Sequence, residues 1–336
     1  MQMIDVHSHV TPIDFPAAPA AAVAGRWPCM KCQSARKATL LVGEKPFREL
    51  DDRSWDPARR IEDMDRDGVA VQVLSPMPEL LSYWLDASPA ALICDHANAQ
   101  IAEMVAAHPT RFRGLGAARL QDVARAVEDL HRLKEIFGLS GVEIGSNING
   151  KMLGDAEFLP FFEAAHALGL AVFVHALHPV AAAHLSASPS FTAFAGFPID
   201  VAMAVSSILM AGVMDKFPSL RLGFSHGGGA VGAIVGRLDT GWEKTGGYDG
   251  QVTRPSEQMR RMFFDSNVYE PRYLGYLARD VAPGRIFVGT DYPYLIMQDD
   301  PGAFVGAAGL SADAERSLRS GAAAAYLDEP VSRLLP

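Results

Sequence analysis

Histidine or aspartate side chains stand at the ends of four apolar runs that are typical of β-strands. The first run carries His7 and His9, and the other three end at His175, His226 and Asp291. Residues two apart on a strand share a face, so both imidazoles of the first run can point at one ion. A His-x-His pair alone is a weak signal, and each residue alone is more often a hydrogen-bonded histidine or a turn-capping aspartate. Four such strand ends in one chain favour a single functional site.

The donor types predict a metal site with one ion. The imidazoles of His7, His9 and His175 and the carboxylate of Asp291 suit zinc or a similar divalent ion with an open position for water. A bound ion would lower the pKa of that water toward neutrality or act as a Lewis acid. His226 is the additional imidazole, and its near-neutral intrinsic pKa makes it the expected general acid or base. The glycines that follow it, residues 227–229, are expected to leave space for its ring.

The elements that must position these residues alternate between strand-like and helix-like runs. A closed parallel (β/α)8 barrel gathers the carboxyl ends of its strands around one mouth, whereas a doubly wound open sheet, the alternative, would not normally collect them there. We therefore predict an α/β fold, a TIM barrel, as one domain over residues 1–336. The eight predicted strands, each followed by helical sequence, are Met3–Val10, Val69–Leu74, Phe112–Leu120, Gly141–Ile144, Ala171–Val174, Arg221–Phe224, Phe263–Val268 and Ile286–Gly289.

The segment after the first predicted strand is too long for an ordinary βα connection. Residues 11–55 begin with an irregular Pro/Ala-rich stretch and continue as a polar region. Long insertions at this face usually form part of a pocket or a lid, so this one is expected to contribute to the active-site mouth. Met77 and Tyr294 are expected either to line that mouth or to pack in the core. A long helix is predicted over Val201–Phe217.

Composition argues against several classes of protein. The chain of 336 residues is 49% hydrophobic and 21% charged, which is typical of a soluble globular protein. Its formal net charge of −9 argues against nucleic acid or an anionic membrane as a partner. The longest apolar stretch, Val201–Met214, is too short to span a bilayer and predicts a buried or subunit-contact helix. With three cysteines and no signal-peptide pattern, the cytoplasm is the expected location.

Several segments resemble one known family of enzymes. His7–His9, Phe173–His175, Ser225–Gly229 and Gly289–Pro293 resemble the metal-site segments of the amidohydrolase superfamily, and more narrowly of its amidohydrolase-2 branch of non-oxidative decarboxylases. Within that branch the chain is most similar to the decarboxylases of α-amino-β-carboxymuconate-ε-semialdehyde, over nearly its whole length. The matching segments outside the metal site are Phe47-Arg48, Trp55–Pro57, Arg60–Met64 and Gly236-Arg237.

The resemblance implies a zinc-dependent barrel enzyme, with one ion per chain, that acts on a carboxylated semialdehyde made by ring cleavage in aromatic catabolism. It implies that the metal is held by His7, His9, His175 and Asp291. It also implies that His226 deprotonates the metal-bound water or carries protons to the substrate. These roles match the ones that the residue types suggest on their own.

Two arginines are implied to bind the substrate. Arg48, on the insertion, would bind a substrate carboxylate, and Arg237 would reach into the site of the neighbouring subunit, which requires a homodimer. A guanidinium gives always-charged, bidentate recognition of a carboxylate, although each arginine alone is more often a surface or salt-bridged residue. The pair favours a small anionic substrate, most simply a dicarboxylate.

Other residues bear on the choice of subfamily. Hydroxybenzoate decarboxylases of this branch usually carry Glu-x-His on the first strand, whereas position 7 here is histidine. Two-metal hydrolytic members usually carry a carbamylated lysine on the fourth strand, and Gly141–Gly145 contains none. One ion is therefore expected. Glu143 could be an extra ligand, but a role away from the ion is favoured. Where the relatives have a tryptophan near the pocket, this chain has Phe191, Phe194 and Phe197.

Alternative functions stay open on the sequence. The same scaffold supports a metal-dependent hydrolase or hydratase of a related dicarboxylate or lactone, because a fold does not decide a function. A non-catalytic, zinc-stabilised binding protein is disfavoured because it would leave His226 without a purpose. Amino and hydroxy muconate semialdehydes both fit as substrates. The lone pair Cys29 and Cys32 is interpreted as two free thiols, because no second pair accompanies it.

Overall fold

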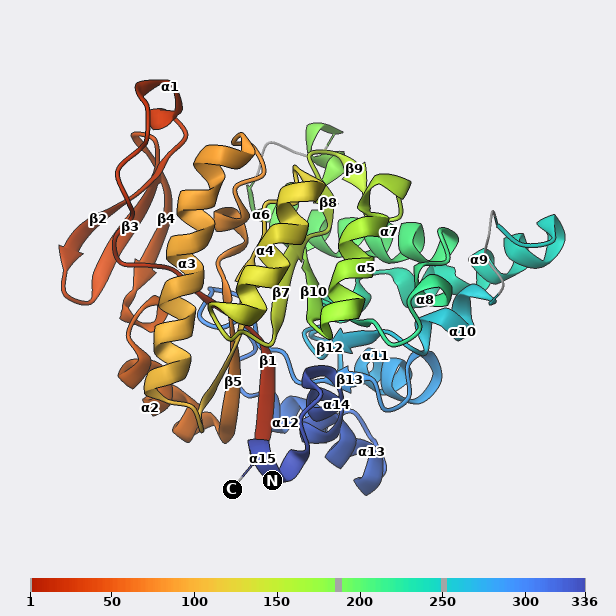
Figure 1. Ribbon diagram of the computed structural model, residues 1–336. Helices are drawn as coiled ribbons and strands as arrows, with labels where there is room; N and C mark the ends of the chain where they lie inside the picture. Colours follow the sequence, from red (N-terminus) through yellow and green to blue (C-terminus); the bar gives the residue numbers. More distant parts are fainter. Residues whose placement is uncertain (1, 185–188, 249–252, 336) are drawn as a thin grey trace.

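Eight parallel strands form the centre of the molecule. The structure is a computed structural model that describes residues 2–184, 189–248 and 253–335. The strands follow one another around the sheet in chain order, and parallel bridges from Asp5 to Val288 and from Ser8 to Tyr292 join the last strand to the first. The predicted TIM barrel is therefore confirmed (Figure 1). Its strands are β1 (Met3–Val10), β5 (Val69–Pro76), β6 (Phe112–Ala117), β7 (Gly141–Gly145), β10 (Ala171–His175), β11 (Arg221–Phe224), β12 (Phe263–Asp265) and β13 (Ile286–Phe287).

Helices between the strands cover the outside of the barrel (Figure 1). The prediction of one long helix over Val201–Phe217 is wrong, because the chain forms two helices there. Gly212 separates them with a φ of 62°, a left-handed conformation that glycine adopts readily. The main helices are α2 (Pro57–Asp67), α3 (Ala87–Ala107), α4 (Val123–Glu135), α5 (Leu159–Leu168), α7 (Phe197–Met210), α8 (Val213–Lys216), α9 (Val231–Thr245), α11 (Pro271–Tyr276) and α14 (Ala322–Leu327).

The insertion after β1 contains a small sheet that the sequence did not predict. Its antiparallel strands are β2 (Pro28–Ser34), β3 (Lys37–Val42) and β4 (Lys45–Asp51). Two-residue connections join them, and Gly43 in the second has a φ of 64°. One side of this sheet is buried, because Leu40 and Leu50 pack in an apolar cluster with Met77 of the barrel loops. The region predicted only as polar, up to residue 55, therefore contains an ordered sheet over residues 28–51 with one apolar, buried side.

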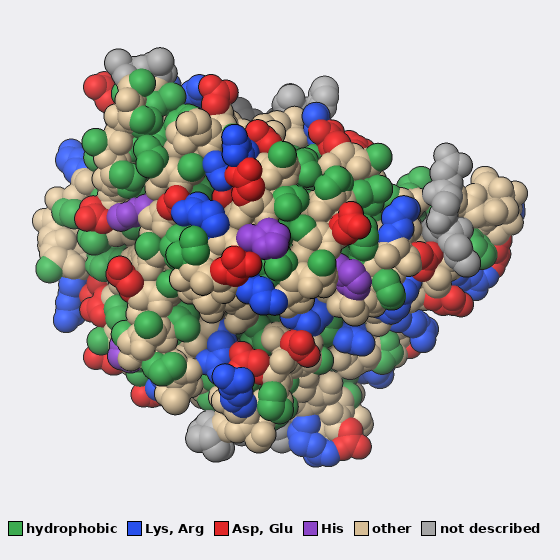
Figure 2. Space-filling model, viewed as in Figure 1, with side chains coloured by type: hydrophobic (Ala, Val, Ile, Leu, Met, Phe, Trp, Pro, Cys, Tyr) green, Lys and Arg blue, Asp and Glu red, His purple; other side chains and the backbone are tan. Residues whose placement is uncertain are grey.

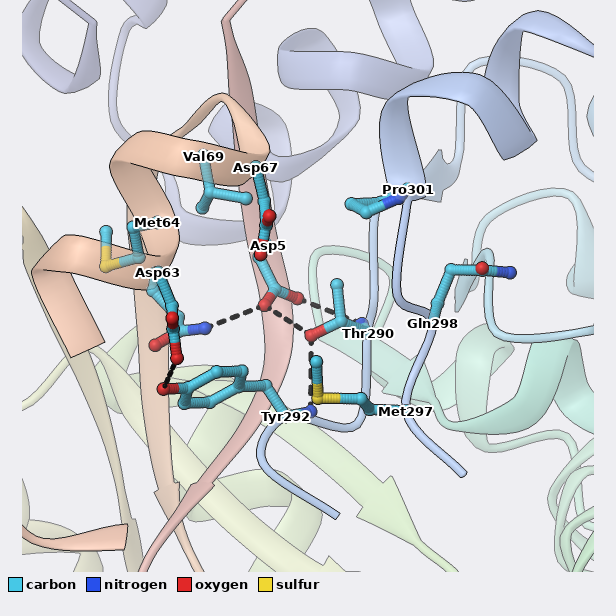
Figure 3. Close-up of a pocket in the computed structure, with 11 residues that line it drawn as sticks. Asp5, Asp63, Met64, Asp67, Val69, Thr290, Tyr292, Met297, Gln298 and Pro301 are labelled. Carbon is cyan, nitrogen blue, oxygen red and sulfur yellow. Dashed lines mark hydrogen bonds between the residues drawn. The ribbon is translucent and has the colours of Figure 1, made fainter. Parts of the chain in front are cut away.

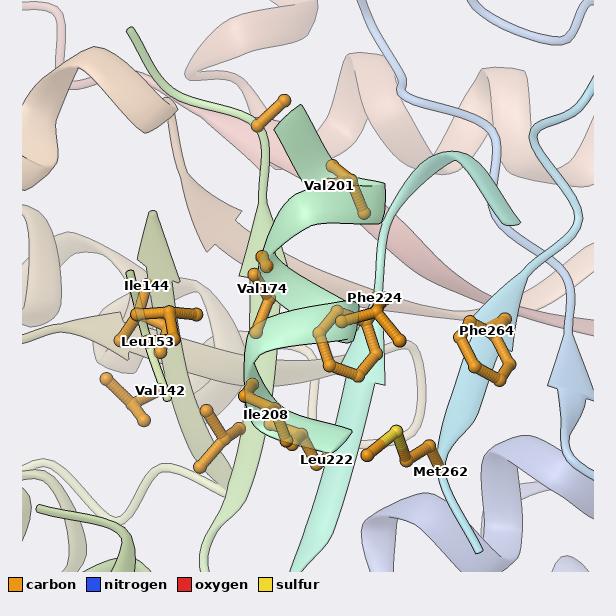
Figure 4. Packing of buried hydrophobic residues seen from close by; sticks show 14 of the residues in the cluster. Val142, Ile144, Leu153, Val174, Val201, Ile208, Leu222, Phe224, Met262 and Phe264 are labelled. Carbon is orange, nitrogen blue, oxygen red and sulfur yellow. The ribbon is translucent and has the colours of Figure 1, made fainter. Parts of the chain in front are cut away.

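Apolar side chains fill the space between the barrel wall and its helices. Val174, Phe224 and Phe264 of three adjacent strands face Val201 and Ile208 of α7 (Figure 4). A second cluster, which includes Ile4, Val6, Phe173 and Phe287 together with Tyr326 of α14, occupies the inside of the barrel below the mouth. Packed side chains of this kind make the barrel a core rather than a pore. They leave the strand ends at the mouth as the place for polar chemistry.

The surface of the chain is mixed in character. On the face shown in Figure 2, acidic and basic side chains are interspersed, and that face has no extended basic patch.

One helical run in the described part of the chain, Thr192–Met210, is long and apolar enough to cross a membrane by length and composition alone, with a mean hydropathy of 1.7. Its inward face, which includes Val201, Val205 and Ile208, packs in the core, so a core helix explains the composition. Cys29 and Cys32 are free and exposed.

Candidate metal centre

An irregularity in β1 brings His7 and His9 to the inside of the barrel. The pairing of β1 with β5 slips between Asp5 and Ser8, where three steps on β1 match two on β5. Ile4 and Val6 pack inside the barrel, and the slip lets the next inward residues be His7 and His9 rather than Ser8. Irregularities of this kind re-aim side chains near active sites. The expected shared direction of the two imidazoles is observed.

The four predicted ligands meet in one buried cluster. One donor atom from each of His7, His9, His175 and Asp291 lies within 4.8 Å of the other three. The Asp291 Oδ1 atom is 3.3 Å from His7 Nε2, 3.2 Å from His9 Nε2 and 4.0 Å from His175 Nε2. Among the described residues, His175 Nε2 and Asp291 Oδ1 have no hydrogen-bond partner although both atoms are buried. A divalent cation would satisfy these converging lone pairs, so the residues present fit a metal ion.

The other ring nitrogen of each histidine is held by a hydrogen-bond acceptor. His7 Nδ1 lies 2.6 Å from Asp265 Oδ2, His9 Nδ1 lies 3.1 Å from the carbonyl oxygen of Pro76, and His175 Nδ1 lies 2.8 Å from that of Ala176. An acceptor at Nδ1 places the proton there and leaves the Nε2 lone pair for a metal. The three imidazoles are therefore oriented before any ion binds.

Asp265, at the end of β12, is a site residue that the sequence interpretation missed. Besides His7, its carboxylate accepts hydrogen bonds from the backbone nitrogens of His226, Gly227 and Asn267, at 3.0, 2.7 and 3.0 Å. It is completely buried. The predicted seventh strand, Phe263–Val268, placed Asp265 in its interior, whereas β12 ends at Asp265 in the same way that β10 ends at His175. One carboxylate thus fixes both a metal-binding histidine and the turn that carries the proposed acid/base residue.

Glu143 lies closer to the ligands than expected. It projects from β7 into the barrel, is completely buried, and places Oε2 at 3.6 Å from His9 Nδ1. Burial raises the pKa of its carboxyl group to about 8. Burial therefore favours the neutral form of the Glu143 carboxyl group when no ion is bound.

His226 stands beside the cluster on a strained turn. Its Nε2 atom is 3.9 Å from Asp291 Oδ2, and its ring centroid is 5.2 Å from that of His175. At 9% exposed it has the largest accessible fraction of these histidines. The φ angles of His226 and Asp291 are 53° and 65°, a region that side chains other than glycine rarely adopt and that is often found at functional sites. The position suits a group that faces both the metal centre and an incoming substrate.

The glycines after His226 let the backbone turn tightly where a side chain would not fit. Gly229 has a φ of 60°, and a Cβ atom on it would lie 1.7 Å from the carbonyl oxygen of Pro198 at the start of α7. A Cβ atom on Gly227 would lie 2.3 Å from the side chain of Val268. We expected these glycines to make room for the His226 ring. In the structure they instead allow the turn to pack closely against neighbouring segments.

Arg48 reaches the metal centre from the insertion. Its guanidinium lies 4.4 Å from the centroid of the Tyr294 ring, and that ring stacks on His9 at 5.1 Å with an interplanar angle of 22°. The side chain is half-buried, and no ion pair engages it within the described part of the chain. The Tyr294 ring thus separates the Arg48 guanidinium, which has no ion-pair partner among the described residues, from the imidazole of His9. Tyr294 is half-buried between Arg48 and His9, whereas Met77 is buried in the core.

Arg237 lies elsewhere, on an exposed surface of α9. The helix points away from the barrel (Figure 1), and no contact within the described chain brings Arg237 to the metal centre. Of the three phenylalanines noted in the sequence, Phe197 lies near the site, with its ring centroid 6.4 Å from that of His226. Phe191 and Phe194 are exposed. The site of one chain therefore contains one of the two predicted arginines.

Burial and neighbouring charges shift the pKa values of the cluster when no ion is bound. Burial lowers the pKa of His7, but the Asp291 and Asp265 carboxylates outweigh it and raise the value to about 10. Burial lowers the pKa of His9 to about 4 and that of His175 well below its ordinary value. Burial also raises the pKa of the Asp291 carboxyl group, but the surrounding histidines outweigh it and keep the pKa well below its usual range.

These shifts predict how metal binding depends on pH. At pH 7 only His7 carries a proton that a metal must displace, because its pKa is about 10 while those of His9 and His175 are lowered. Between pH 7 and that pKa, each rise of one pH unit makes the deprotonated form of His7 about ten times more abundant. The affinity for the metal should therefore increase by about tenfold per pH unit, with about one proton released per ion bound. Calorimetric titrations in buffers of different ionisation enthalpy measure that number. Release of three protons would contradict the assigned charge states.

Comparison with known proteins places the chain in a family. A family model described as amidohydrolase matches residues 4–328. The chain belongs to this amidohydrolase family. The 2-amino-3-carboxymuconate-6-semialdehyde decarboxylase of Dictyostelium discoideum is 32% identical over 306 residues, which are 90% of this chain and 84% of that protein. The resemblance predicted from the sequence is thereby confirmed.

Solved structures agree with the fold of this amidohydrolase. The 5-carboxyvanillate decarboxylase of Sphingomonas paucimobilis has a TM-score of 0.77 at 25% identity, covering 98% of this chain and 99% of that one. A dihydroxybenzoic acid decarboxylase from a Polaromonas species, with bound manganese and the inhibitor 2-nitroresorcinol, has a TM-score of 0.73 at 20% identity, covering 97% of each chain. Both comparisons support the barrel fold, and the buried histidine and aspartate cluster supports a divalent metal centre in this protein.

Proposed function

We propose that this amidohydrolase is a metal-dependent, non-oxidative decarboxylase of an aminocarboxymuconate-semialdehyde-like ring-cleavage product in the cytoplasm. The observation that carries the proposal is the grouping at one barrel mouth of a metal cluster, a separate imidazole and a guanidinium that forms no ion pair with the described residues. The 32% identity to a decarboxylase of such a semialdehyde supports the substrate class.

The proposed roles follow from position and charge. Arg48 binds a substrate carboxylate through its guanidinium. His226 supplies the proton that replaces the departing carboxyl group on its carbon, while the electron pair of the breaking carbon–carbon bond passes through the conjugated aldehyde system. A divalent ion held by His7, His9, His175 and Asp291 would act as a Lewis acid or lower the pKa of a water. The balance is one proton consumed and one CO2 released.

Zinc is the proposed ion. Three imidazoles and one carboxylate are a nitrogen-rich donor set that zinc prefers, whereas manganese favours oxygen ligands. Apo-protein reconstituted separately with each metal would test the choice. Higher activity and tighter binding with zinc are expected, and a higher activity with manganese would reverse the assignment.

The decisive experiment uses the intact zinc-loaded protein. It is mixed with aminocarboxymuconate semialdehyde made fresh by enzymatic ring cleavage, and the loss of substrate absorbance is followed together with release of CO2. Equal amounts of both are expected. Loss of absorbance without CO2 would reject decarboxylation and favour a hydratase or hydrolase acting on the same compound.

A homodimer that shares arginines is also proposed. Arg237 lies on exposed α9, and the packed pair α7 and α9 also exposes Ile199, Met203 and Ile234, at 47%, 39% and 37%. Exposed apolar side chains beside an exposed arginine suit a contact with a second copy. In such a dimer the Arg237 side chain would complete the substrate site of its partner.

Mixing two variants tests this sharing. Arg48→Ala and Arg237→Ala should each raise KM by about tenfold or more, because each loses a charged hydrogen bond to the substrate. After the two are unfolded together and refolded, one site in each mixed dimer has both arginines, so about a quarter of all sites should recover. No recovery would place Arg237 outside the neighbouring site.

A further inference from the structure

The largest fully buried side chain of the molecule belongs to Arg60, which lies on α2 behind β1. A buried guanidinium normally pairs with a carboxylate, because desolvating a charge is costly. Within the described part of the chain, no carboxylate oxygen lies within ion-pair distance of Arg60. Its hydrogen bonds run instead to neutral acceptors, and these acceptors belong to the segments that build the site.

The donors of Arg60 join the metal-binding strand to the insertion. Nη1 donates both to the carbonyl oxygen of His9 and to that of Arg53, each at 2.8 Å. Nη2 donates to Ser8 Oγ at 3.1 Å. Arg53 lies in the helical turn Asp52–Ser54, which follows β4, the strand that carries Arg48. One planar group therefore connects the His-x-His segment with the end of the segment that presents the proposed substrate arginine.

A second set of contacts extends from Arg60 toward Asp291. Nε donates to Gln72 Oε1 at 3.0 Å, Gln72 Nε2 donates to Asp5 Oδ2 at 2.9 Å, and Asp5 Oδ2 accepts from Thr290 Oγ1 at 2.7 Å. On the other side of Asp291, the Arg60 guanidinium lies 4.7 Å from the Tyr292 ring centroid.

Figure 3 shows this cluster around Asp5, including the hydrogen bond of 2.9 Å from the Tyr292 hydroxyl to Asp63. A cavity of about 10 Å³ at its centre leaves room for no more than a water molecule. The residues on both sides of Asp291 are thus tied to the network that Arg60 joins to β1. Little free space remains through which one segment could shift against another.

We propose that Arg60 is a positioning residue that fixes Arg48 and Asp291 relative to the histidines on β1. A guanidinium offers five donors in one plane, so a single side chain can satisfy acceptors from three segments at set angles. Lysine keeps the charge but has a single nitrogen that cannot span them. The part that concerns Arg48 rests on the proposed function, whereas the part that concerns the metal centre rests on geometry alone.

The test compares Arg60→Lys with Arg319→Lys in the full-length protein. Arg319 is also buried and donates to Glu315 and to the carbonyl oxygen of Gly302, and among the described residues it forms no hydrogen bond with the segments that carry the ligands. Affinity for zinc alone is measured by competition with a chromogenic chelator. Arg60→Lys should weaken zinc binding about 10- to 100-fold, as loss of outer-shell support typically does, and raise KM more than it lowers kcat. Arg319→Lys should change neither.

Zinc affinity within twofold of wild type in folded Arg60→Lys would overturn the proposal. Weakened zinc binding with unchanged KM would overturn the part that concerns Arg48. Zinc binding is measured without substrate. It therefore still tests the part of the proposal that concerns Asp291 if the protein turns out not to be a decarboxylase. If Arg60→Lys does not fold, Ser8→Ala removes one acceptor of Arg60, together with the hydrogen bond from Ser8 Oγ to the carbonyl oxygen of Val73. It should weaken zinc binding about threefold or more, and unchanged affinity there would count against the proposal.

Discussion

His226→Ala is expected to lower kcat by about 10²- to 10⁴-fold while the protein keeps its full metal content. The His226 ring is not one of the four donors that converge on a common point, so removing it leaves the cation site intact. It stands beside that site, 3.9 Å from Asp291 Oδ2, and is partly open to an incoming substrate. Loss of a positioned acid or base should therefore appear in kcat. Steady-state kinetics and elemental analysis of the same sample measure both quantities.

A matched histidine is available as a control. His178 also follows β10 at the mouth, but its exposed ring pairs with Glu79 at 3.1 Å and contacts no ligand. His178→Ala should change kcat by less than about twofold, as expected for a surface pair. A His226→Ala protein that keeps both its metal and full activity would remove the acid/base assignment.

The sequence could predict the barrel because its signals are local. Each strand is a short apolar run, and parallel strands in a closed barrel meet at one end, so strand-end residues such as His175 and Asp291 had to converge. The break between α7 and α8 occurs at a single residue, Gly212. An isolated glycine within an apolar helical run does not by itself predict the end of a helix. The small sheet of the insertion depends on burial against Met77, which no local pattern reveals.

The contacts around the ligands depend on distant parts of the chain. Asp265 is 258 residues from His7, and Arg60 is 51 residues from His9. Arginine on an amphipathic helix is normally assigned to the solvent side, so the burial of Arg60 runs against the ordinary pattern. The slip in β1 that turns His7 inward is likewise a property of pairing with β5. Ligand identity could be inferred from strand ends, but ligand orientation required the three-dimensional arrangement.

Asp265→Asn is expected to weaken metal binding about 10- to 100-fold and to lower kcat as well. The carboxylate accepts from His7 Nδ1 through Oδ2, and from the backbone nitrogens of His226 and Gly227 through both oxygens. An asparagine amide has one oxygen, so its NH2 group must face at least one of these donors. Either His7 loses its fixed ring orientation, or the turn that carries His226 loses a backbone hydrogen bond.

The control for Asp265→Asn is Asp129→Asn. Asp129 is also buried and accepts from the backbone nitrogen and guanidinium of Arg119, but it lies on α4, away from the metal centre. That variant should lose stability without any change in zinc affinity, because an unpaired buried donor destabilises the fold and not the ion. Unchanged zinc affinity in both variants would mean that Nδ1 of His7 needs no carboxylate. The effect of Asp265 on His226 would then be tested only by the kcat of Asp265→Asn. An unchanged kcat would leave Asp265 with a structural role only.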